Sequence, residues 1–292
     1  MDLDGNANVD RLTGVSETLL IPLACRARAS REKRFKNFTD PKAEEICARF
    51  DIDLKRYAGN TPTMRGAVAR GMWYDRQVLR FLEKNPGAVV FSVGSGLNTM
   101  FERVLAQASS ADWRWIDSDL PDVAALRREV FSDDSRRATH IFDAVGPNWA
   151  QHEWLQNASP LLVISEAVLI YLLEDDVKSF FRSLAEFGSE RSRCGILFDW
   201  CSPEMVKRSS KHPALKKLKS EQVVFRSSLR RAKDIRSYDD KWRVRSETSE
   251  VMTRSGVGPA IFSFIFRIVT LGRRLYGMAE AELLCKSKGY SA

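Results

Sequence analysis

The order of segments along the chain predicts an α/β protein whose parallel sheet is covered by helices on both faces. Short apolar runs alternate with amphipathic runs of helical length, which is typical of strands joined by crossover helices. One run, LLVIS at residues 161–165, is apolar almost throughout, as expected for a strand buried on both faces. The first run leads directly into Gly94-Ser95-Gly96, a turn of the kind that opens a helix beside a ligand. The predicted strands are residues 88–93, 113–117, 139–142, 161–165 and 195–199.

Three helical patterns precede the first strand. Asp40 is placed to cap the second of them, with Pro41 at its first position, and Asn85-Pro86-Gly87 ends the third with strong breakers. We therefore expect an N-terminal helical cover over residues 1–87 and a core over residues 88–292. The three patterns cover residues 17–34, 40–51 and 63–84.

The second half of the core contains an insertion and two late β-like stretches. Residues 203–240 interrupt the alternation after the fifth strand and predict an inserted lid. Residues 242–248 and 261–271 follow as β-like segments. The apolar stretch 257–272 is too short to span a bilayer and carries Arg267, so we expect a buried strand with its flanks. The helices between the strands are predicted at residues 99–108, 123–131 and 174–187.

Composition limits the class of protein. A chain of 292 residues with 44% hydrophobic residues is long enough for one large α/β domain with an insertion. Three histidines, and five cysteines without metal-ligand spacing, argue against a bound metal and favour a reducing, cytoplasmic compartment. The N-terminal residues do not show a basic segment followed by a long apolar run, so we expect no signal peptide in this sequence. The oligomeric state has no signature in the sequence.

The net charge of +8 is concentrated in the predicted lid. Between Lys207 and Arg236 there are eleven Lys and Arg, opposed only by Glu221 and Asp234. Such a run is usually a solvated face. It could instead attract an anionic substrate. Nucleic acid is disfavoured, because aromatic residues are not interleaved through the run.

The glycine turn at residues 94–96 suggests a nucleotide, although a purely structural turn has the same pattern. Glycine lets the backbone turn sharply, and the helix behind it points free N–H groups at a ligand. Thr99 stands where the third glycine of the dinucleotide fingerprint would be. A site for a nucleotide without a pyrophosphate is therefore favoured over a dinucleotide site.

Acidic residues follow three successive strands of the predicted sheet. Asp117 and Asp119 end the second strand, Asp143 follows the third, and Glu166 follows the fourth. A carboxylate at the end of the second strand can accept hydrogen bonds from both ribose hydroxyls. NAD and S-adenosylmethionine both present that diol, and the latter has no phosphate. Any one of these acids could instead be a helix cap.

Several motifs resemble the leucine carboxyl methyltransferase family, in particular the branch containing O-methyltransferases of aromatic polyketide biosynthesis, of the tetracenomycin type. They occur in the family's order and cover roughly residues 16–245. The resemblance implies a class I S-adenosylmethionine-dependent methyltransferase fold: a Rossmann-like seven-stranded sheet, its last strand antiparallel, with an N-terminal helical cover and an inserted lid. The motifs are ETLLIPLACRARAS, VARGMWYD, VVFSVGSGLNTMFERVL, WRWIDSDLPDVAALRREVF, LLVISEAVLIYL and HPALKKL.

The resemblance assigns cofactor contacts to charged side chains. Arg26 and Arg70 match the residues that hold the cofactor carboxylate, which a guanidinium binds well. Asp119 matches the acid on the ribose, and Glu166 the acid near the methionine ammonium and the sulfonium. Arg26 and Arg70 could alternatively be partners in surface ion pairs.

The remaining cofactor contacts follow from the same resemblance. Gly94 and Gly96 match the backbone turn beneath the methionine part. Asp143 and Ala144 match the adenine contact. The chain departs from the family in one place, because the usual aspartate and arginine after the glycine turn are Asn98 and Met100 here.

Residues toward the acceptor are less clearly indicated. Tyr171 lies in a motif near the expected substrate entry, although core packing is the more usual role for such a residue. Arg226 and Arg245 are candidates to face an anionic acceptor. His212 is expected to be a structural residue of the lid, and no side chain is assigned a catalytic role.

Taken together, these patterns predict an S-adenosylmethionine-dependent O-methyltransferase for a small, anionic acceptor, with a carboxylate favoured over a phenol. A nicotinamide-dependent oxidoreductase is an alternative that Thr99 argues against. A protein or RNA carboxyl methyltransferase would use the basic lid for a macromolecular partner. A cofactor-binding protein without activity is the alternative that is not an enzyme.

Overall fold

A seven-stranded mixed sheet forms the centre of the computed structural model, which describes residues 12–32, 35, 37–110, 112–212, 215–218 and 223–284. The strand order is β3-β2-β1-β4-β5-β7-β6. Neighbouring strands from β1 to β5 pair in parallel, and β7 runs antiparallel to both β5 and β6. The predicted fold class is confirmed. The strands are β1 (Ala88–Val93), β2 (Trp113–Asp119), β3 (Arg137–Ile141), β4 (Leu161–Ser165), β5 (Cys194–Cys201), β6 (Trp242–Thr248) and β7 (Tyr276–Leu283).

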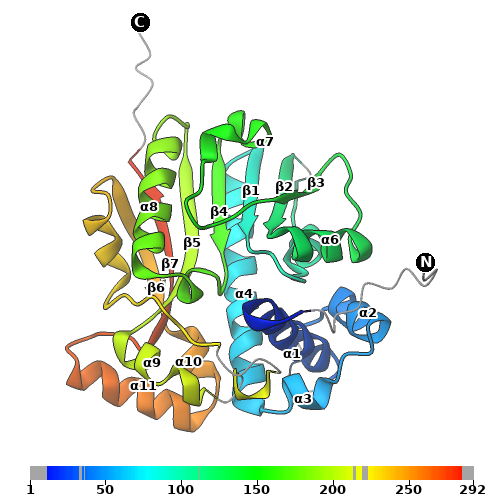
Figure 1. The fold of residues 1–292 in the computed structure, drawn as a ribbon, viewed down its shortest axis with the longest axis vertical. Helices are drawn as coiled ribbons and strands as arrows, with labels where there is room; N and C mark the ends of the chain where they lie inside the picture. The colour runs from blue at the N-terminus through cyan, green and yellow to red at the C-terminus, as the bar shows by residue number, and fades with distance from the viewer. Residues whose placement is uncertain are drawn as a thin grey trace, which may run out of the picture.

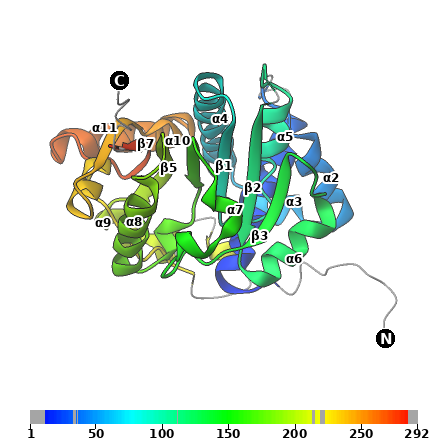
Figure 2. The same cartoon turned by 90° about the horizontal axis from the view of Figure 1, so that it is seen from above.

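Helices bury both faces of this sheet, and β4 shows how the sequence divides between them. Leu162 and Ile164 join the core cluster formed with α4 and α5, whereas Leu161 and Val163 join the cluster formed with α8. Figure 2 shows α4 and α8 on opposite faces. The covering helices are α4 (Thr61–Lys84), α5 (Met100–Leu105), α6 (Pro121–Val130), α7 (Glu153–Gln156) and α8 (Glu174–Gly188), with 3-10 turns at Trp149–Gln151 and Leu169–Tyr171.

Of the N-terminal helices, α4 packs on the sheet, whereas α1 and α3 pack on α4 and α2 packs on α1. Asp40 caps α2 as predicted, with its side chain accepting a hydrogen bond from the N–H of Ala43. The predicted helix or pair of helices before the first strand is one continuous helix, α4, which Asn60 caps. The Tyr74 hydroxyl of α4 donates to the carbonyl of Ser165 at the end of β4 (3.1 Å). The preceding elements are a 3-10 turn (Gly14–Leu19), α1 (Leu20–Ser30), α2 (Pro41–Arg49) and α3 (Leu54–Ala58).

The segment between β5 and β6 contains short helical turns. Figure 1 shows α1–α3 and α9–α11 as two helical groups beneath one edge of the sheet, on either side of α4. The ends of the predicted cover and core, at residues 1–11 and 285–292, and lid residues 213, 214 and 219–222 lie outside the described residues. Most described Lys and Arg of this segment are exposed, which fits a solvated face. The elements between β5 and β6 are α9 (Pro203–Lys207) and 3-10 turns at Ser209–Lys211, Leu215–Lys217 and Ala232–Ser237.

The end of the chain differs from the prediction. Residues 261–271 were expected to form a strand, but most of them belong to helix α11 (Val257–Val269), which follows α10 (Glu250–Arg254). Most residues of α11 are isoleucine, phenylalanine or valine, which have high strand propensity, so the sequence favoured a strand there. The seventh strand is β7, which the sequence patterns did not predict because its alanines and glutamates have low strand propensity. Within the described ranges, no helix has both the length and the apolar character needed to cross a bilayer.

A close approach of two loops at the carboxyl edge of the sheet requires glycine at position 94. Gly94 has a φ of +60°, and an added Cβ would lie 2.4 Å from Cγ2 of Val168, in the loop after β4. Gly146 has nearly the same φ, +61°, with nothing within 4 Å of an added Cβ. The two positions therefore separate backbone strain from steric contact.

We predict that Gly94→Ala destabilises the fold more than Gly146→Ala. Each substitution should lower the free energy of unfolding by about 1–2 kcal/mol, because alanine is strained in a left-handed backbone conformation. Gly94→Ala should lower it by roughly 1–3 kcal/mol more, because the added methyl group overpacks against Val168. Denaturant unfolding measures both, and Val168→Ala in the Gly94→Ala background should recover part of the difference. Equal losses at the two glycines would show that the contact with Val168 has no energetic weight.

Candidate functional site

A cavity of about 600 Å³ lies at the carboxyl edge of the parallel strands. Its lining combines the loops after β1, β2, β3 and β4 with side chains from the N-terminal helices and from the segment after β5. Ligands of open α/β sheets bind at this edge. All of the residues predicted to contact the cofactor line it, namely Arg26, Arg70, Gly94, Gly96, Asp119, Asp143, Ala144 and Glu166.

The turn after β1 is held from below by an arginine. Gly94 and Gly96 both have positive φ, +60° and +49°. The guanidinium of Arg127, on α6, donates to the carbonyls of Ser95 and Gly96 and is fully buried. The sequence analysis did not identify this residue, although a single arginine on the apolar face of an amphipathic helix was its signal.

The two acids at the end of β2 have different roles. Asp117 is buried in ion pairs with Arg127 (2.6 Å) and Arg137 (2.7 Å), away from the cavity. Burial alone would raise the pKa of Asp117, but the two arginines outweigh it and hold the pKa below its ordinary value. Asp119 lines the cavity and accepts hydrogen bonds from the N–H groups of Gly96 (2.7 Å) and Leu120 (2.8 Å). Burial raises the pKa of Asp119.

A carboxylate accepts about four hydrogen bonds. After the two backbone bonds, the carboxylate of Asp119 can still accept from two hydroxyls. Of the acid pair, Asp119 rather than Asp117 is therefore the one able to bind a ribose diol.

Glu166 is the centre of a second polar group. One carboxylate oxygen accepts from Nε of Arg70 (2.8 Å), and the other accepts from the amide of Asn98 (2.8 Å). Arg70 also reaches the hydroxyl of Tyr276 (3.5 Å), which in turn donates to Asp199. Burial by itself would raise the pKa of Glu166, but Arg70 and Arg26 lower it overall, so the side chain is ionised at neutral pH.

Asn98, the residue at which the chain departs from the family pattern, connects Glu166 with the start of α5. Its amide donates to Glu166, while its carbonyl oxygen accepts from the N–H of Met100 (3.1 Å). An aspartate at this position would place a second carboxylate against Glu166 and could not donate. The asparagine therefore holds the Glu166 carboxylate through a neutral donor.

A third polar group lies under the N-terminal helices. Arg26 contacts Asp40 (3.1 Å), and Arg103 contacts the same Asp40 oxygen (2.7 Å) and both oxygens of Asp75 (2.7 and 3.0 Å). Thr99, at the position of the missing third glycine, donates its hydroxyl to Asp40 (2.6 Å). Arg26 is therefore a buried ion-pair partner rather than a surface one, at the wall of the cavity.

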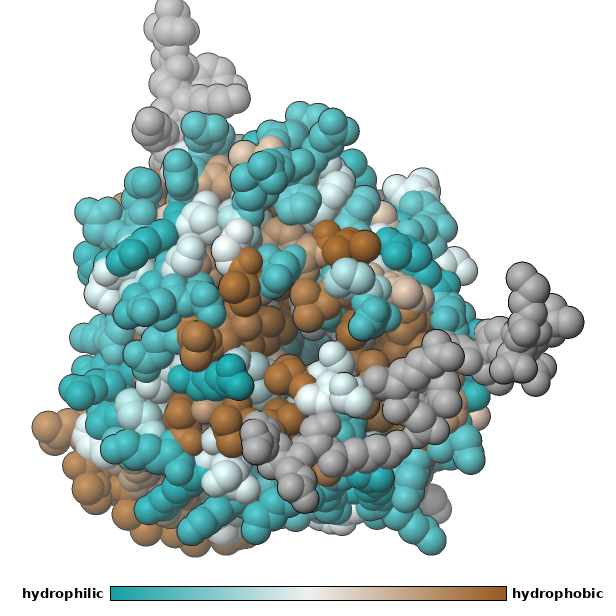
Figure 3. Space-filling model, in the orientation of Figure 1, coloured by the Kyte–Doolittle hydropathy of each residue, from teal (hydrophilic) through white to brown (hydrophobic). Residues whose placement is uncertain are grey.

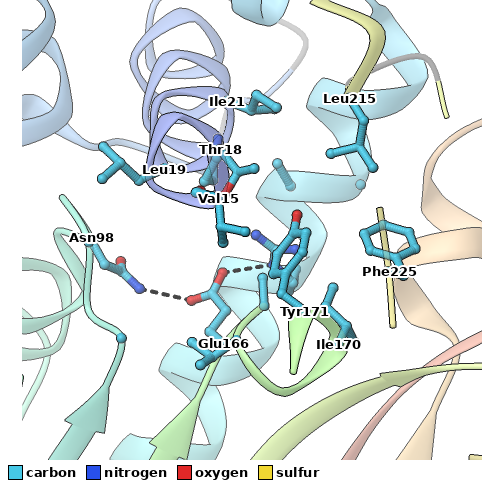
Figure 4. A pocket seen from close by; sticks show the side chains of 18 of the residues that line it. Val15, Thr18, Leu19, Ile21, Asn98, Glu166, Ile170, Tyr171, Leu215 and Phe225 are labelled. Atoms are coloured by element: carbon cyan, nitrogen blue, oxygen red, sulfur yellow. Dashed lines mark hydrogen bonds and ion pairs between the residues drawn. The ribbon is translucent and has the colours of Figure 1, made fainter. Parts of the chain in front are cut away.

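The remaining half of the cavity is mainly apolar. Figure 4 shows Tyr171, Leu215 and Phe225 grouped away from Asn98, with Glu166 between. The rings of Tyr171 and Phe225 lie 5.6 Å apart, and His212 approaches Phe225 at 5.8 Å. Burial lowers the pKa of His212 below its ordinary value. His212, expected to be structural, thus contributes a neutral imidazole to the cavity lining.

Two of the predicted acceptor residues do not reach the cavity. The backbone of Arg226 pairs with Ile170, but its side chain is exposed outside the lining. Arg245 lies on the edge strand β6, where it pairs with Glu282 (2.8 Å). The cavity therefore does not support their prediction as acceptor contacts, because the charge of a segment indicates solvent exposure but not which way a side chain points. Tyr171 does line the cavity.

Comparison with known proteins gives two curated relatives, and no family model matches the chain. The tetracenomycin polyketide synthesis O-methyltransferase TcmP of Streptomyces glaucescens is 33% identical over 175 residues, which cover 59% of this chain and 62% of that protein. The S-adenosyl-L-methionine-dependent methyltransferase dpfgK of Gibberella zeae is 27% identical over 186 residues, covering 59% of this chain and 61% of that protein. The chain thus spans about three fifths of the length of each relative.

Among solved structures, a Thermobifida fusca protein described as a candidate methyltransferase matches with a TM-score of 0.60. The match covers 98% of this chain and 100% of that chain at 14% identity, so it concerns the fold alone. The resemblance to the tetracenomycin-type branch is confirmed over the 175 matched residues, whereas no family model supports the wider leucine carboxyl methyltransferase family. The chain is a sequence relative of the tetracenomycin O-methyltransferase, and its fold is that of the Thermobifida fusca protein.

Proposed function

We propose that this chain is an S-adenosylmethionine-dependent O-methyltransferase acting on a small organic acceptor. The observation that carries the proposal is one cavity with two kinds of wall. Paired arginines and acids form one end, and apolar and aromatic side chains form the other. A zwitterionic nucleoside suits the first end, and an apolar acceptor suits the second.

The charged end suits the parts of S-adenosylmethionine in order. Arg70 and Arg26 would bind the methionine carboxylate, and Glu166 would face the ammonium. Asp119 would accept the ribose hydroxyls, and the loop at Asp143 and Ala144 would border the adenine. When bound, the cofactor supplies an activated methyl group.

The apolar end would hold the acceptor oxygen in line with that methyl group. Orientation alone can contribute about 7–11 kcal/mol to such a transfer, so no nucleophilic side chain is needed. The relative whose name places it in tetracenomycin polyketide synthesis supports a polyketide acceptor. The rings of Tyr171 and Phe225 at this end of the cavity favour an aromatic one. We favour a carboxylate as the attacking group, since it is ionised at neutral pH without a base.

A phenol is a second candidate acceptor because His212 lines the apolar end. A phenol with a pKa near 10 needs a base at neutral pH. The lowered pKa of His212 leaves its imidazole neutral there and able to accept a proton.

We also propose that residues 1–87 act as a helical cover and residues 203–240 as a lid over the core at residues 88–292. Side chains from both segments line the cavity. Substrate entry would then depend on the lid rather than on the sheet.

We predict that Asp119→Ala weakens S-adenosylhomocysteine binding at least tenfold. Hydrogen bonds to a charged group contribute roughly 1.5–3 kcal/mol, and the substitution removes the acceptor for the ribose. Calorimetric titration measures the dissociation constant, and Asp122→Ala, an exposed acid three residues away, is the control. Asp119→Asn should lie between the two, because it keeps an acceptor for the Gly96 N–H. An unchanged constant in Asp119→Ala would place the ribose elsewhere.

We predict that His212→Asn leaves turnover of an aromatic carboxylic acid nearly unchanged. A carboxylate with a pKa near 4 needs no base, so its turnover should be flat from about pH 6 to pH 9. Initial rates with a matched acid and phenol make the measurement. If the phenol is preferred and the substitution reduces its turnover about 100-fold or more, as loss of a general base does, the carboxylate proposal is wrong and the phenol proposal holds.

A further inference from the structure

Helix α11 exposes apolar side chains along its whole length. Figure 3 shows them gathered at the lower left of the molecule, where Figure 1 places the helix. Contiguous apolar patches of more than a few hundred Å² usually mark an interaction surface. The large apolar residues of α11 that are at least half exposed are Val257, Ile261, Phe262, Phe264, Ile265, Ile268 and Val269, and Leu271 just after the helix is exposed as well.

The exposed residues occupy one continuous face. Ile261, Ile265 and Ile268 follow the spacing of successive helical turns, so they form a stripe on one side. Ser263, on the other side, is buried against the protein. The side that faces solvent is therefore the more apolar one, which is the reverse of an ordinary surface helix.

An arginine cluster borders this apolar face. Arg76, Arg254, Arg267 and Arg274 line a second cavity of about 770 Å³, together with part of α11. Of the described residues in that lining, Glu250 is the single acid, and it pairs with both Arg76 (2.7 Å) and Arg254 (2.8 Å). Arg274 pairs with Glu247 (3.2 Å), which lies just outside this lining. Four arginines against these two glutamates still leave an excess of positive charge, and Arg267 is exposed beside the apolar face.

We propose that α11 and this arginine cluster form a docking surface for an anionic phospholipid membrane. An interfacial helix buries its apolar face at the boundary between headgroups and acyl chains, with arginines beside it at the level of the phosphates. At 13 residues, about 20 Å, α11 suits lying in that plane. A second copy of the chain is the less suitable occupant, because it would bring two positively charged clusters together.

The docking surface adjoins the main cavity. Pro259, in the first turn of α11, lines that cavity together with Val251, Met252 and Ser255 of the preceding segment. The proposal concerns binding only and does not depend on methyl transfer, so the two can fail separately.

Vesicle flotation of the full chain tests the proposal. Wild-type protein should float with vesicles of phosphatidylcholine and phosphatidylglycerol, and much less with phosphatidylcholine alone. Added salt should weaken the binding. The triple variant Ile261→Ser, Ile265→Ser, Ile268→Ser should lose at least tenfold in partitioning, and Arg267→Gln should lose several-fold on anionic vesicles only.

Matched controls are Leu173→Ser and Ile141→Ser, which change exposed apolar residues elsewhere, and Arg245→Gln, an exposed arginine on β6. Circular dichroism checks that each variant folds, and the Arg267→Gln result remains decisive if the triple variant does not. Absence of wild-type binding, equal binding to both vesicles, or binding unchanged by both α11 variants would overturn the proposal. A dimer in sedimentation that the triple variant dissociates, without vesicle binding, would assign the face to a second copy instead.

Discussion

The ion pair between Arg70 and Glu166 joins most of the elements that meet at the cavity. Arg70 comes from α4 and Glu166 from the end of β4, while Asn98 from the turn after β1 holds the second oxygen of Glu166. Asp199 of β5 and Tyr276 of β7 extend the network along the same face to the neighbouring strands. Removing one partner of a buried ion pair typically costs about 3–5 kcal/mol, so each of these elements is restrained by the others.

This arrangement explains why the site can be charged and yet rigid. Arg26 and Arg103 share Asp40 in a second network next to the first, so the cations at the cavity wall are compensated within the protein. A ligand that carries both a carboxylate and an ammonium group can bind without leaving a buried charge unpaired. Asn98 donates to Glu166 as a neutral side chain, so it holds that carboxylate without changing the charge of the site.

Features determined by neighbouring residues could be predicted from the sequence. The apolar runs of β1, β4 and β5 predicted the sheet. The acids at strand ends predicted that Asp119 and Glu166 lie together at the cavity, because parallel strands all end at the same edge of a sheet. Contacts between distant segments could not be predicted in this way. The support of the glycine turn by Arg127 depends on how α6 packs.

The C-terminal third showed the limits of sequence patterns most clearly. The basic run did not indicate which side chains point inward. Arg226 in that run and Arg245 in β6 were both candidates, and both lie outside the cavity. In α11, apolar residues were taken for a buried strand although most are exposed. Hydrophobicity predicts burial only when the chain itself supplies the covering surface, and among the described residues nothing covers this face of α11.

A calorimetric comparison of S-adenosylhomocysteine with 5′-methylthioadenosine tests the central claim most directly. The two share the adenosine part, but only the first carries the amino-acid zwitterion that Arg70, Arg26 and Glu166 would bind. Because charged hydrogen bonds contribute roughly 1.5–3 kcal/mol each, S-adenosylhomocysteine should bind at least about 100-fold more tightly. Equal affinities, or tight binding of NADH with no response to S-adenosylhomocysteine, would contradict a zwitterion site built around the Arg70–Glu166 pair.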